Sequence, residues 1–419
     1  MKSKDVVFLC QFFYPEYISS ATLPFDTAKA LKDAGYSVSV ICGYPEEYSN
    51  TNEKVPLKEV VDGIEIQRLK YIQLKRSSFI GRIINYFSFT FSALLNLYKL
   101  RNFKIAIVYS NPPVLPLVTF IANKIFGLKV VFVSYDVYPE IAVKTNVIQS
   151  TSIIAKFMEK LNKVIFKNIS KVVALSTEMK DYLINSREGL SNDNVEVIPN
   201  WYESDVIYNK NNAKQNPIFK DIIQKEPLII SYFGNMGIAQ DMETILDTIR
   251  KLKDNKNVHF LFAGHGNKME TLKLKLAEER IENTTIFDFL HGQDFSDALA
   301  VSDAFIVSLE SSLNGLCVPS KTYSYMSAGK PILAIMNPQC DISIDLANYN
   351  AGFTVETGQS EALVNYIITL GNEEIAKEMG NNCRVLFLNK FTKDICTNKY
   401  VNLINQVLES EACLQTKHY

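Results

Sequence analysis

Short apolar runs alternate with helix-length stretches over most of the 419 residues. Strands that alternate with helices in this way form mainly parallel sheets with helices on both faces. The pattern therefore predicts an α/β fold. In the first half of the chain the predicted strands are 6–10, 37–42, 105–109, 130–134, 172–175 and 195–198.

A polar stretch rich in Asn and Lys, 205–225, separates this series from a second one. The second series has predicted strands at 228–233, 258–263, 285–287, 304–307 and 331–335. A chain of this length is too long for one ordinary core and suits two domains. We therefore expect a first domain over 1–205, a second over 206–393 and a separate C-terminal helix in 394–419.

Composition excludes several classes of protein. The net charge of −1 speaks against a nucleic-acid-binding protein, which usually carries a clear basic excess. The seven cysteines are scattered without any C-x-x-C spacing, so neither a disulfide framework nor a zinc site is expected. The first strand begins near residue 6 with no long apolar segment before it, which favours a cytoplasmic protein.

Residues 67–135 form a basic block that contains no Asp or Glu. Within it, residues 83–98 carry no charge but are too few to span a bilayer. An apolar helix beside basic residues is typical of a protein that lies on an anionic membrane surface. The alternative is a core helix beside a solvated basic face. The basic residues predicted to meet lipid headgroups are Arg68, Lys70, Lys75, Arg76 and Arg82.

The stretch 318–333 has the strongest local pattern. Pro319 and Ser320 are good residues to open a helix, and Gly329 is placed to end it before the strand at 331–335. The first backbone amides of a helix bind anions, and Lys321 adds a positive charge at the same end. The pattern fits a diphosphate site, although an ordinary loop, helix and strand with a surface lysine remains an alternative.

Glycines follow two other strands of the second series. Gly234, Asn235 and Gly237 come after the strand at 228–233, and Gly264 comes after the strand at 258–263. Carboxyl ends of parallel strands lie at one edge of a sheet, where α/β proteins bind ligands. Each glycine motif alone is a weak signal, but together with Lys321 they predict a nucleotide site.

Taken in order, several motifs resemble those of family 4 retaining glycosyltransferases, in particular the bacterial subgroup that builds O-antigen, capsule and other lipid-linked glycans. The motifs are Tyr14-Pro15-Glu16, Ser110-Asn111-Pro112-Pro113, Tyr135-Asp136-Val137-Tyr138-Pro139-Glu140, Val197-Ile198-Pro199-Asn200-Trp201, Gly234-Asn235-Met236-Gly237 and Pro319-Ser320-Lys321. The resemblance implies a GT-B fold, in which two Rossmann-like domains face a central cleft. It also implies transfer of a hexosyl or N-acetylhexosaminyl group from a nucleotide sugar, with UDP expected as the nucleotide, to a lipid-linked glycan at the inner face of the cell membrane.

The resemblance also implies a donor site and no metal cofactor, because backbone amides and a lysine neutralise the leaving diphosphate. Besides the residues already named, the donor site would include Phe289 and Leu290 near the base and Gly315, Leu316, Ser320 and Ser324 around the diphosphate and ribose. The chain departs from the family here, since Leu316 and Ser324 stand where relatives usually carry two glutamates.

A second departure concerns catalysis, because the histidine that many relatives carry in the first domain is missing. The catalytic candidates are therefore Asp136 and Glu140, with Glu16 behind them. Asp136 follows the strand at 130–134, so its carboxylate is placed to accept a proton or hydrogen bond from an acceptor hydroxyl. Alternatively, Asp136 and Glu140 only order the loop before the next helix.

Two rival functions follow from these departures. A GT-B protein that has lost its catalytic groups would act as a non-catalytic partner or glycan-binding subunit of an active transferase. A nucleotide-sugar epimerase on the same fold would alter the donor with no acceptor present.

Overall fold

The computed structural model describes residues 4–45, 54–75, 78–205, 208, 210–224 and 227–415. The chain forms two compact units. Unit 1 contains Met1–Pro199, Gly315–Cys317 and Asp394–Tyr419, and unit 2 contains Asn200–Asn314 and Val318–Lys393. Unit 1 thus ends a few residues before the expected boundary at 205, and a short segment from the second half of the sequence, Gly315–Cys317, belongs to it.

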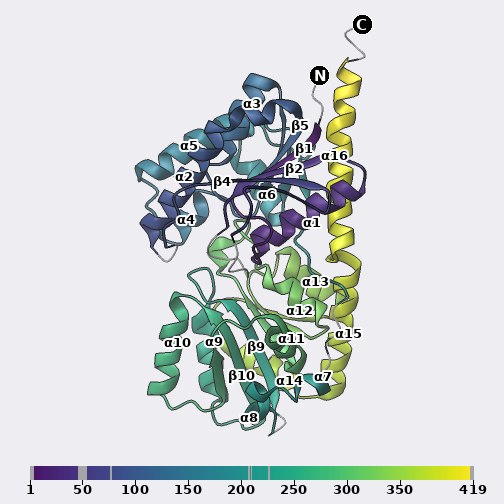
Figure 1. Ribbon diagram of the computed structural model, residues 1–419. Helices are drawn as coiled ribbons and strands as arrows, with labels where there is room; N and C mark the ends of the chain where they lie inside the picture. Colours follow the sequence, from purple (N-terminus) through teal and green to yellow (C-terminus); the bar gives the residue numbers. More distant parts are fainter. Residues whose placement is uncertain are drawn as a thin grey trace. The chain divides into compact units, whose positions relative to one another are not determined.

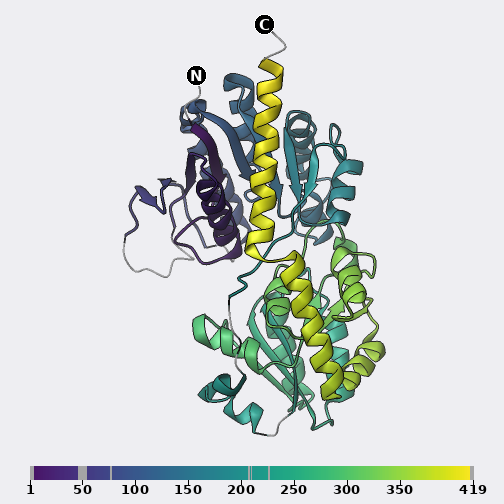
Figure 2. The same ribbon diagram turned by 90° about the vertical axis from the view of Figure 1, so that its right-hand side faces the viewer.

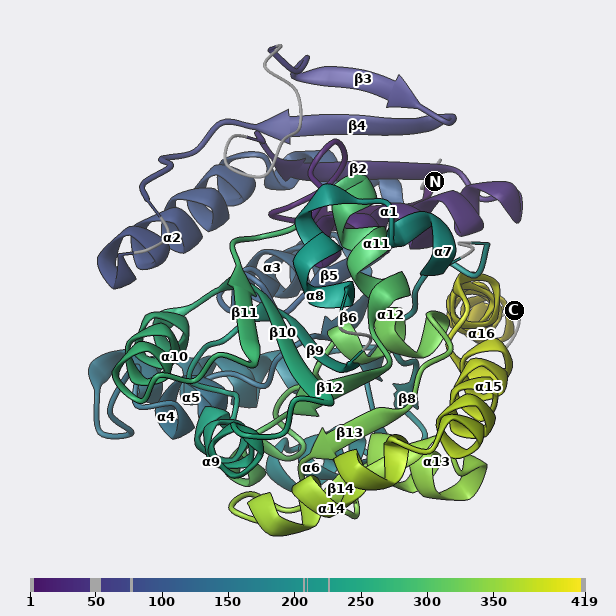
Figure 3. The same cartoon turned by 90° about the horizontal axis from the view of Figure 1, so that it is seen from below.

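Unit 1 is built on one sheet in the order β3-β4-β2-β1-β5-β6-β7-β8. Every predicted strand of the first series is present, and all neighbours are parallel except β3 and β4. Figure 3 shows the β3–β4 hairpin at one edge of this sheet. The strand bounds are β1 Lys4–Cys10, β2 Val38–Gly43, β3 Lys58–Val61, β4 Ile64–Leu69, β5 Phe103–Tyr109, β6 Lys129–Ser134, β7 Lys171–Ala174 and β8 Val195–Val197.

Helices cover this sheet on both faces. One layer holds α2, α3 and α5, and α1 lies with the C-terminal helix α16 (Figure 1). Lys129 on β6 donates a hydrogen bond to the carbonyl of Val407 on α16, which runs alongside unit 1 in Figure 2. The helix bounds are α1 Ser19–Asp33, α2 Phe79–Leu95, η1 Leu97–Asn102, α3 Pro116–Phe126, α4 Glu140–Lys144, α5 Ile153–Phe166, α6 Thr177–Ser186 and α16 Lys393–Gln415.

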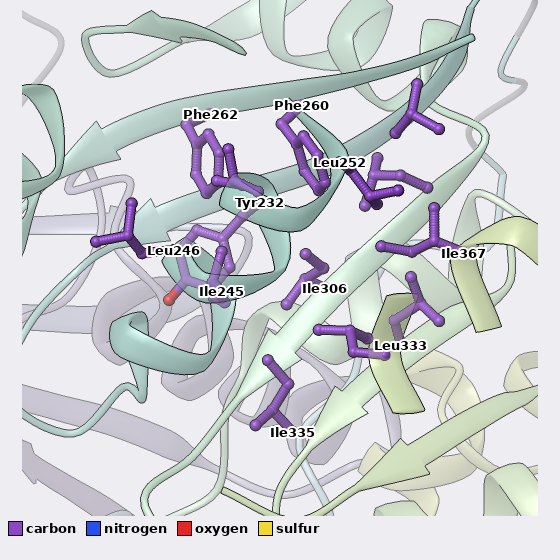
Figure 4. Close-up of a cluster of buried hydrophobic side chains, with 14 of the residues drawn as sticks. Tyr232, Ile245, Leu246, Leu252, Phe260, Phe262, Ile306, Leu333, Ile335 and Ile367 are labelled. Atoms are coloured by element: carbon purple, nitrogen blue, oxygen red, sulfur yellow. The ribbon is translucent and has the colours of Figure 1, made fainter. Parts of the chain in front are cut away.

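Unit 2 has a fully parallel sheet in the order β11-β10-β9-β12-β13-β14. Its apolar core includes Tyr232, Phe260, Phe262 and Leu333, which Figure 4 shows between the strands and the covering helices. The strand bounds are β9 Leu228–Asn235, β10 Val258–His265, β11 Thr284–Phe287, β12 Ala304–Ser308, β13 Ile332–Ile335 and β14 Gly352–Val355.

The helices of unit 2 follow the strands in sequence. The helix predicted after Pro319 is present and ends before Gly329, whose φ of 66° only glycine adopts readily. The bounds are α7 Lys210–Ala213, η2 Pro217–Phe219, α8 Lys220–Ile223, α9 Met242–Leu252, α10 Asn267–Glu278, α11 Gly292–Val301, η3 Ser311–Leu313, α12 Lys321–Ser327, α13 Asp341–Tyr349, α14 Ser360–Leu370 and α15 Glu373–Lys390.

Candidate active site

Two glycine-bearing strand ends lie side by side in unit 2. Gly264 on β10 is in register with Gly234 on β9, and a Cβ on Gly264 would lie 2.0 Å from the carbonyl oxygen of Gly234. Gly266 must also be a glycine, because a Cβ at this position would lie 2.4 Å from the carbonyl oxygen of Met236. These glycines allow the two strand ends to approach closely.

Lys321 reaches the same edge from the first turn of α12. Its Nζ donates hydrogen bonds to the hydroxyl of Tyr232 at 2.5 Å and to the carbonyl of Asn235 at 3.2 Å, and it lies 4.0 Å from the centre of the Tyr232 ring. A Cβ built on Gly234 would lie 3.4 Å from both Cε and Nζ of Lys321. The structure therefore brings Gly234, Asn235 and Lys321 together, as the sequence predicts.

Burial lowers the pKa of Lys321 to about 7. Desolvation disfavours the charged form of an amine that has no carboxylate partner. A bound diphosphate would supply the missing negative charge and favour protonation. This arrangement suits a lysine that is used to hold an anionic ligand.

Backbone amides at the start of α12 lie beside this lysine. The amides of Ser320 and Lys321 make no backbone hydrogen bond within the described part of the chain, and the side chain of Ser320 does not cap the helix. Ser320 itself is exposed at the helix start. Two amide donors and one lysine are thus available for a ligand.

Aromatic and imidazole rings gather beyond the ends of β10 and β11. The Phe289 ring lies 5.6 Å from the ring of His265 and 4.5 Å from the ring of His291, and all three residues are exposed. Leu290 beside them is half-buried. Exposed rings at a strand end offer a surface on which a flat base can stack.

Three residues predicted for the donor site make contacts away from the edge of the unit 2 sheet where Lys321 lies. Gly315 packs against α6 of unit 1, where a Cβ would lie 2.9 Å from the carbonyl oxygen of Glu178. Leu316 is buried in unit 1, and its carbonyl accepts a hydrogen bond from the amide of Val137. Ser324 is buried, and its hydroxyl donates to the carbonyl of Lys321. The predicted contacts of the Leu316 and Ser324 side chains with the ribose are therefore not supported, because both side chains are engaged elsewhere.

Asp136 lies at the carboxyl end of β6, as predicted. The amides of Tyr135 and Asp136 both donate to the hydroxyl of Ser110, which holds the backbone in place. Burial raises the pKa of the Asp136 carboxyl to about 6. The residue lines a small hollow of unit 1 that also involves Tyr138 and Arg187. A half-buried carboxyl with a raised pKa is suited to accept a proton near neutral pH.

The carboxylate of Glu140 is held in an ion pair with Arg187. Both of its carboxylate oxygens accept hydrogen bonds from Arg187, at 2.6 and 2.7 Å, and Arg187 also donates to the carbonyl of Tyr138. The two side chains are 23% and 8% exposed. The ion pair connects the end of α6 to the start of α4, and the catalytic role of Glu140 stays a prediction.

Glu16 has a similar local role. It is buried, and its carboxylate accepts a hydrogen bond from the amide of Phe13 at 3.3 Å. The amide of Glu16 in turn donates to the carbonyl of Phe13. Glu16 therefore closes the turn after β1, and we assign it no contact with substrate.

Unit 1 also carries polar groups at neighbouring strand ends that were not predicted from the sequence. Gln11 follows β1 and is 1% exposed, yet neither atom of its amide group has a hydrogen-bond partner among the described residues. The buried Oδ1 of Asn111, after β5, also has none there. The sequence already indicated such positions, since Gln11 directly follows one predicted strand and Asn111 is the second residue after another. In unit 2 the missed residue is Tyr232, whose place in an apolar run concealed the contact of its hydroxyl with Lys321.

The predicted membrane residues differ in exposure. Arg68 is buried and donates to Glu59 and to the carbonyls of Pro56 and Tyr14, so it is not available to lipid, and this prediction is wrong. Lys70 and Lys75 are exposed, whereas Arg82 is half-buried. Arg76 lies outside the described residues. No helix in the described part of the chain combines the length and the apolar character needed to cross a bilayer.

The described residues contain no group of three or more His, Cys, Asp or Glu side chains placed to hold a metal ion. Positive charge at the edge of the unit 2 sheet comes from Lys321 and from a second lysine, Lys268. Lys268 donates to the carbonyl of Gln240 at 2.5 Å and lies 3.4 Å from Glu310. Lys268 is therefore partly neutralised, which leaves Lys321 as the better anion ligand.

Comparison with known protein families divides the chain in the same way as the fold. Residues 21–206 match the family described as Glycosyltransferase Family 4, and residues 227–373 match the family described as Glycosyl transferases group 1. A Pseudomonas aeruginosa protein, probable glycosyltransferase WbjE, is 26% identical over 301 residues, which are 71% of this chain and 73% of the relative.

Solved structures share the fold at low identity. Sucrose-phosphate synthase from Thermosynechococcus elongatus aligns with a TM-score of 0.75 at 14% identity, over 97% of this chain and 100% of the other. Anabaena Alr3699/HepE, solved in complex with UDP, aligns with a TM-score of 0.70 at 13% identity, over 96% of this chain and 100% of the other. At this identity the likeness establishes the two-domain fold.

Proposed function

Because the chain is a glycosyltransferase of the GT-B fold, we propose that it transfers a hexosyl or N-acetylhexosaminyl group from a UDP sugar to a lipid-linked or cell-surface glycan, with retention of configuration. The bond between the sugar and the diphosphate breaks, UDP leaves, and the oxygen of an acceptor hydroxyl bonds to the same sugar carbon. The proton of that hydroxyl is lost to a base.

One observation carries the donor half of this proposal. Lys321 and closely packed glycine strand ends meet at the carboxyl edge of the unit 2 sheet, and the amides of Ser320 and Lys321 make no backbone hydrogen bond among the described residues. These groups neutralise a leaving diphosphate by charge and by backbone hydrogen bonds. We therefore expect turnover without a metal cofactor. The complex of Anabaena Alr3699/HepE with UDP supports uridine as the nucleoside of the donor.

The acceptor half rests on Asp136. Its carboxylate lies at the carboxyl edge of the unit 1 sheet with a pKa raised to about 6, so it is mostly ionised at neutral pH and still able to take a proton. Gln11 and Asn111 lie on neighbouring strand ends and offer unused hydrogen-bonding groups for sugar hydroxyls.

A panel of nucleotide sugars tests the donor. A ligand at a hundredfold excess over its Kd stabilises the folded state by about 2.7 kcal/mol, which raises Tm by several degrees. We expect this shift with UDP sugars, a smaller one with ADP, GDP and CMP sugars, and its loss in Lys321→Ala. No shift with any nucleotide sugar would overturn the donor assignment.

Transfer itself is tested with a membrane extract that contains lipid-linked glycans and with a radiolabelled form of the stabilising sugar. Label in the lipid fraction supports the transferase. Donor binding without transfer or hydrolysis would favour the non-catalytic partner. Conversion of the free nucleotide sugar without any acceptor would favour an epimerase.

A further inference from the structure

We propose that Tyr232 and Tyr325 are positioning residues for the donor, because their hydroxyl groups hold Lys321, and the helix that carries it, against the end of β9. We call these two residues the tyrosine pair. This role rests on the proposed function, since Lys321 is the residue expected to bind the donor diphosphate. The three residues and β9 all belong to unit 2.

Tyr232 brings a hydroxyl group from the apolar core to the end of β9. Its side chain is fully buried, and its ring lies 6.2 Å from the ring of Phe262 (Figure 4). The hydroxyl donates to the carbonyl of Asn235 at 2.9 Å and accepts from Nζ of Lys321 at 2.5 Å. A phenylalanine would fill nearly the same space, so packing of the core does not require the hydroxyl. What the hydroxyl adds is a fixed hydrogen-bond acceptor for Lys321.

Tyr325 makes a contact in the opposite direction, from α12 to β9. Its hydroxyl accepts from the amide of Phe233 at 2.6 Å and donates to the carbonyl of the same residue at 2.8 Å. In the described residues the pairing of β9 with β12 runs through Ile230 and Ser231 and does not include Phe233. A buried amide and carbonyl without partners would be costly. The side chain of Tyr325 therefore takes the place of a neighbouring strand at this point of β9.

The two contacts come from one side of α12. Lys321 and Tyr325 are four residues apart, so they point to the same side of the helix. Lys321 reaches Tyr232, and Tyr325 reaches Phe233, the next residue of the strand. The ring of Tyr325 also stacks on Phe305 of β12, with 4.2 Å between centroids and an interplanar angle of 9°. One turn of α12 is thus held on the end of β9 by two adjacent side chains.

A lysine that is fixed in advance binds an anion better. A free lysine side chain loses rotamer freedom when it binds a ligand, whereas a lysine already held by hydrogen bonds has lost most of it. The Tyr232 hydroxyl, and the Tyr232 ring 4.0 Å from Nζ, favour the charged form of Lys321. Neither group carries a negative charge that a diphosphate would have to displace. The tyrosine pair therefore prepares Lys321 for the diphosphate of a nucleotide sugar.

Calorimetric titration of variants that lack one hydroxyl tests this role. Tyr232→Phe should weaken binding of a UDP sugar about tenfold, the usual effect of losing a hydrogen bond to a charged group. Tyr325→Phe should weaken it by at least about threefold, because α12 loses its hydrogen bonds to Phe233. Tyr325→Phe also leaves two buried backbone groups without partners and should lose stability, so Tyr232→Phe is the decisive variant. Wild-type affinity in Tyr232→Phe would overturn the proposal.

Tyr366→Phe is the matched control. The Tyr366 ring stacks on Phe353 with 4.1 Å between centroids and an interplanar angle of 6°, much as Tyr325 stacks on Phe305. Phe353 lies on β14, the edge strand of the unit 2 sheet, and not on β9. The control should keep the donor affinity of the wild type. A loss in the control equal to that in Tyr232→Phe would show that removal of any such hydroxyl acts through stability, and would overturn the proposal.

The pH dependence of donor affinity separates positioning from a general loss of stability. Tyr232→Phe removes an acceptor that favours the ammonium form of Lys321, so the midpoint of this dependence should move down by about half a unit to one unit. Burial raises the pKa of Tyr232 and of Tyr325, so neither tyrosine ionises in this range. Lys268 and Glu310 at the same sheet edge keep their ion pair in the variant. A midpoint that does not move would overturn the proposal.

Acylation of Lys321 by an amine reagent gives a readout that needs no nucleotide. At pH 6 this lysine should react about threefold faster in Tyr232→Phe than in the wild type, because more of the amine is neutral. Lys268 should react equally in both proteins, and peptide mass spectrometry measures the two lysines in one sample. Equal rates for Lys321 would overturn the proposal. Failure of the proposed function looks different, since no nucleotide sugar would then bind the wild type, whatever the rate at Lys321.

Discussion

The ammonium group of Lys321 lies 2.5 Å from the hydroxyl of Tyr232 and 4.0 Å above the ring of the same residue. Lys321 has no carboxylate within salt-bridge distance among the described residues. The Tyr232 hydroxyl and the Asn235 carbonyl fix the position of the Lys321 ammonium group, but neither of these neutral groups cancels its positive charge. Its charge remains available for a ligand.

Donor affinity should therefore depend on the protonation of Lys321. With a pKa of about 7, the side chain is mostly charged at pH 6 and mostly neutral at pH 8. A bound diphosphate favours the charged form, so the affinity for a UDP sugar should fall about tenfold between these pH values. Calorimetric titration with the UDP sugar measures this change directly.

Lys321→Ala should remove both the affinity and most of its pH dependence. Lys268→Ala is the matched control, because Lys268 lies at the same sheet edge but near Glu310. An unchanged pH dependence in Lys321→Ala would show that another group titrates.

A second prediction concerns Asp136. Asp136→Asn should lower turnover at least about a hundredfold, since an amide cannot accept a proton. The same change should raise the free energy of unfolding at pH 8 by about 1 kcal/mol, because the fold raises the pKa of this carboxyl and so disfavours its charged form.

The stability change in Asp136→Asn should itself depend on pH, which allows its cause to be checked. A carboxyl whose folded pKa is raised costs stability above that pKa, and the cost disappears as pH falls below the unfolded value. The stability gain of Asp136→Asn should therefore shrink between pH 6 and pH 4 in urea unfolding experiments. A loss of stability at pH 8 would indicate that Asp136 orders the loop.

The donor edge of unit 2 could be predicted because it depends on local signals. A strand followed by glycine, and a helix opened by Pro319 and Lys321, bring their residues to one edge by the general geometry of parallel sheets. The hairpin of β3 and β4 was missed although Asp62 and Gly63, with φ of 51° and 75°, form a typical turn signal. Its strands are short, and Val60 is exposed, so no apolar run marks them.

The role of Glu140 could not be predicted from sequence. Its partner Arg187 lies 47 residues away, and the pair forms only because α6 packs near the loop after β6. A carboxylate just after a strand has the same sequence pattern whether it faces a ligand or an arginine. Tertiary packing decides between the two, as the contrast between Asp136 and Glu140 shows.

Glu140→Gln tests the structural role. Breaking a largely buried ion pair leaves Arg187 without its partner and should cost about 3 kcal/mol of unfolding free energy. Turnover per folded molecule should stay within a few fold of wild type. The double variant Glu140→Gln/Arg187→Met should recover part of the stability. A hundredfold loss of turnover with unchanged stability would support Glu140 as a catalytic residue.

Gln11 gives the sharpest test of the acceptor side, because an unpartnered buried amide costs stability. Replacing it by Met, which has a similar volume, should raise the free energy of unfolding by about 1–3 kcal/mol. The same variant should raise KM for the acceptor and leave donor affinity unchanged. Urea unfolding and transfer assays measure the two effects.

Gln73→Met is the matched control for Gln11→Met. The side chain of Gln73 donates to the carbonyl of Tyr44 at 2.8 Å, so this substitution should lose about 1 kcal/mol of stability and leave the acceptor KM unchanged. If Gln11→Met instead destabilises the protein as Gln73→Met does, Gln11 is a structural residue. Only a residue kept for a ligand combines gained stability with weaker acceptor binding.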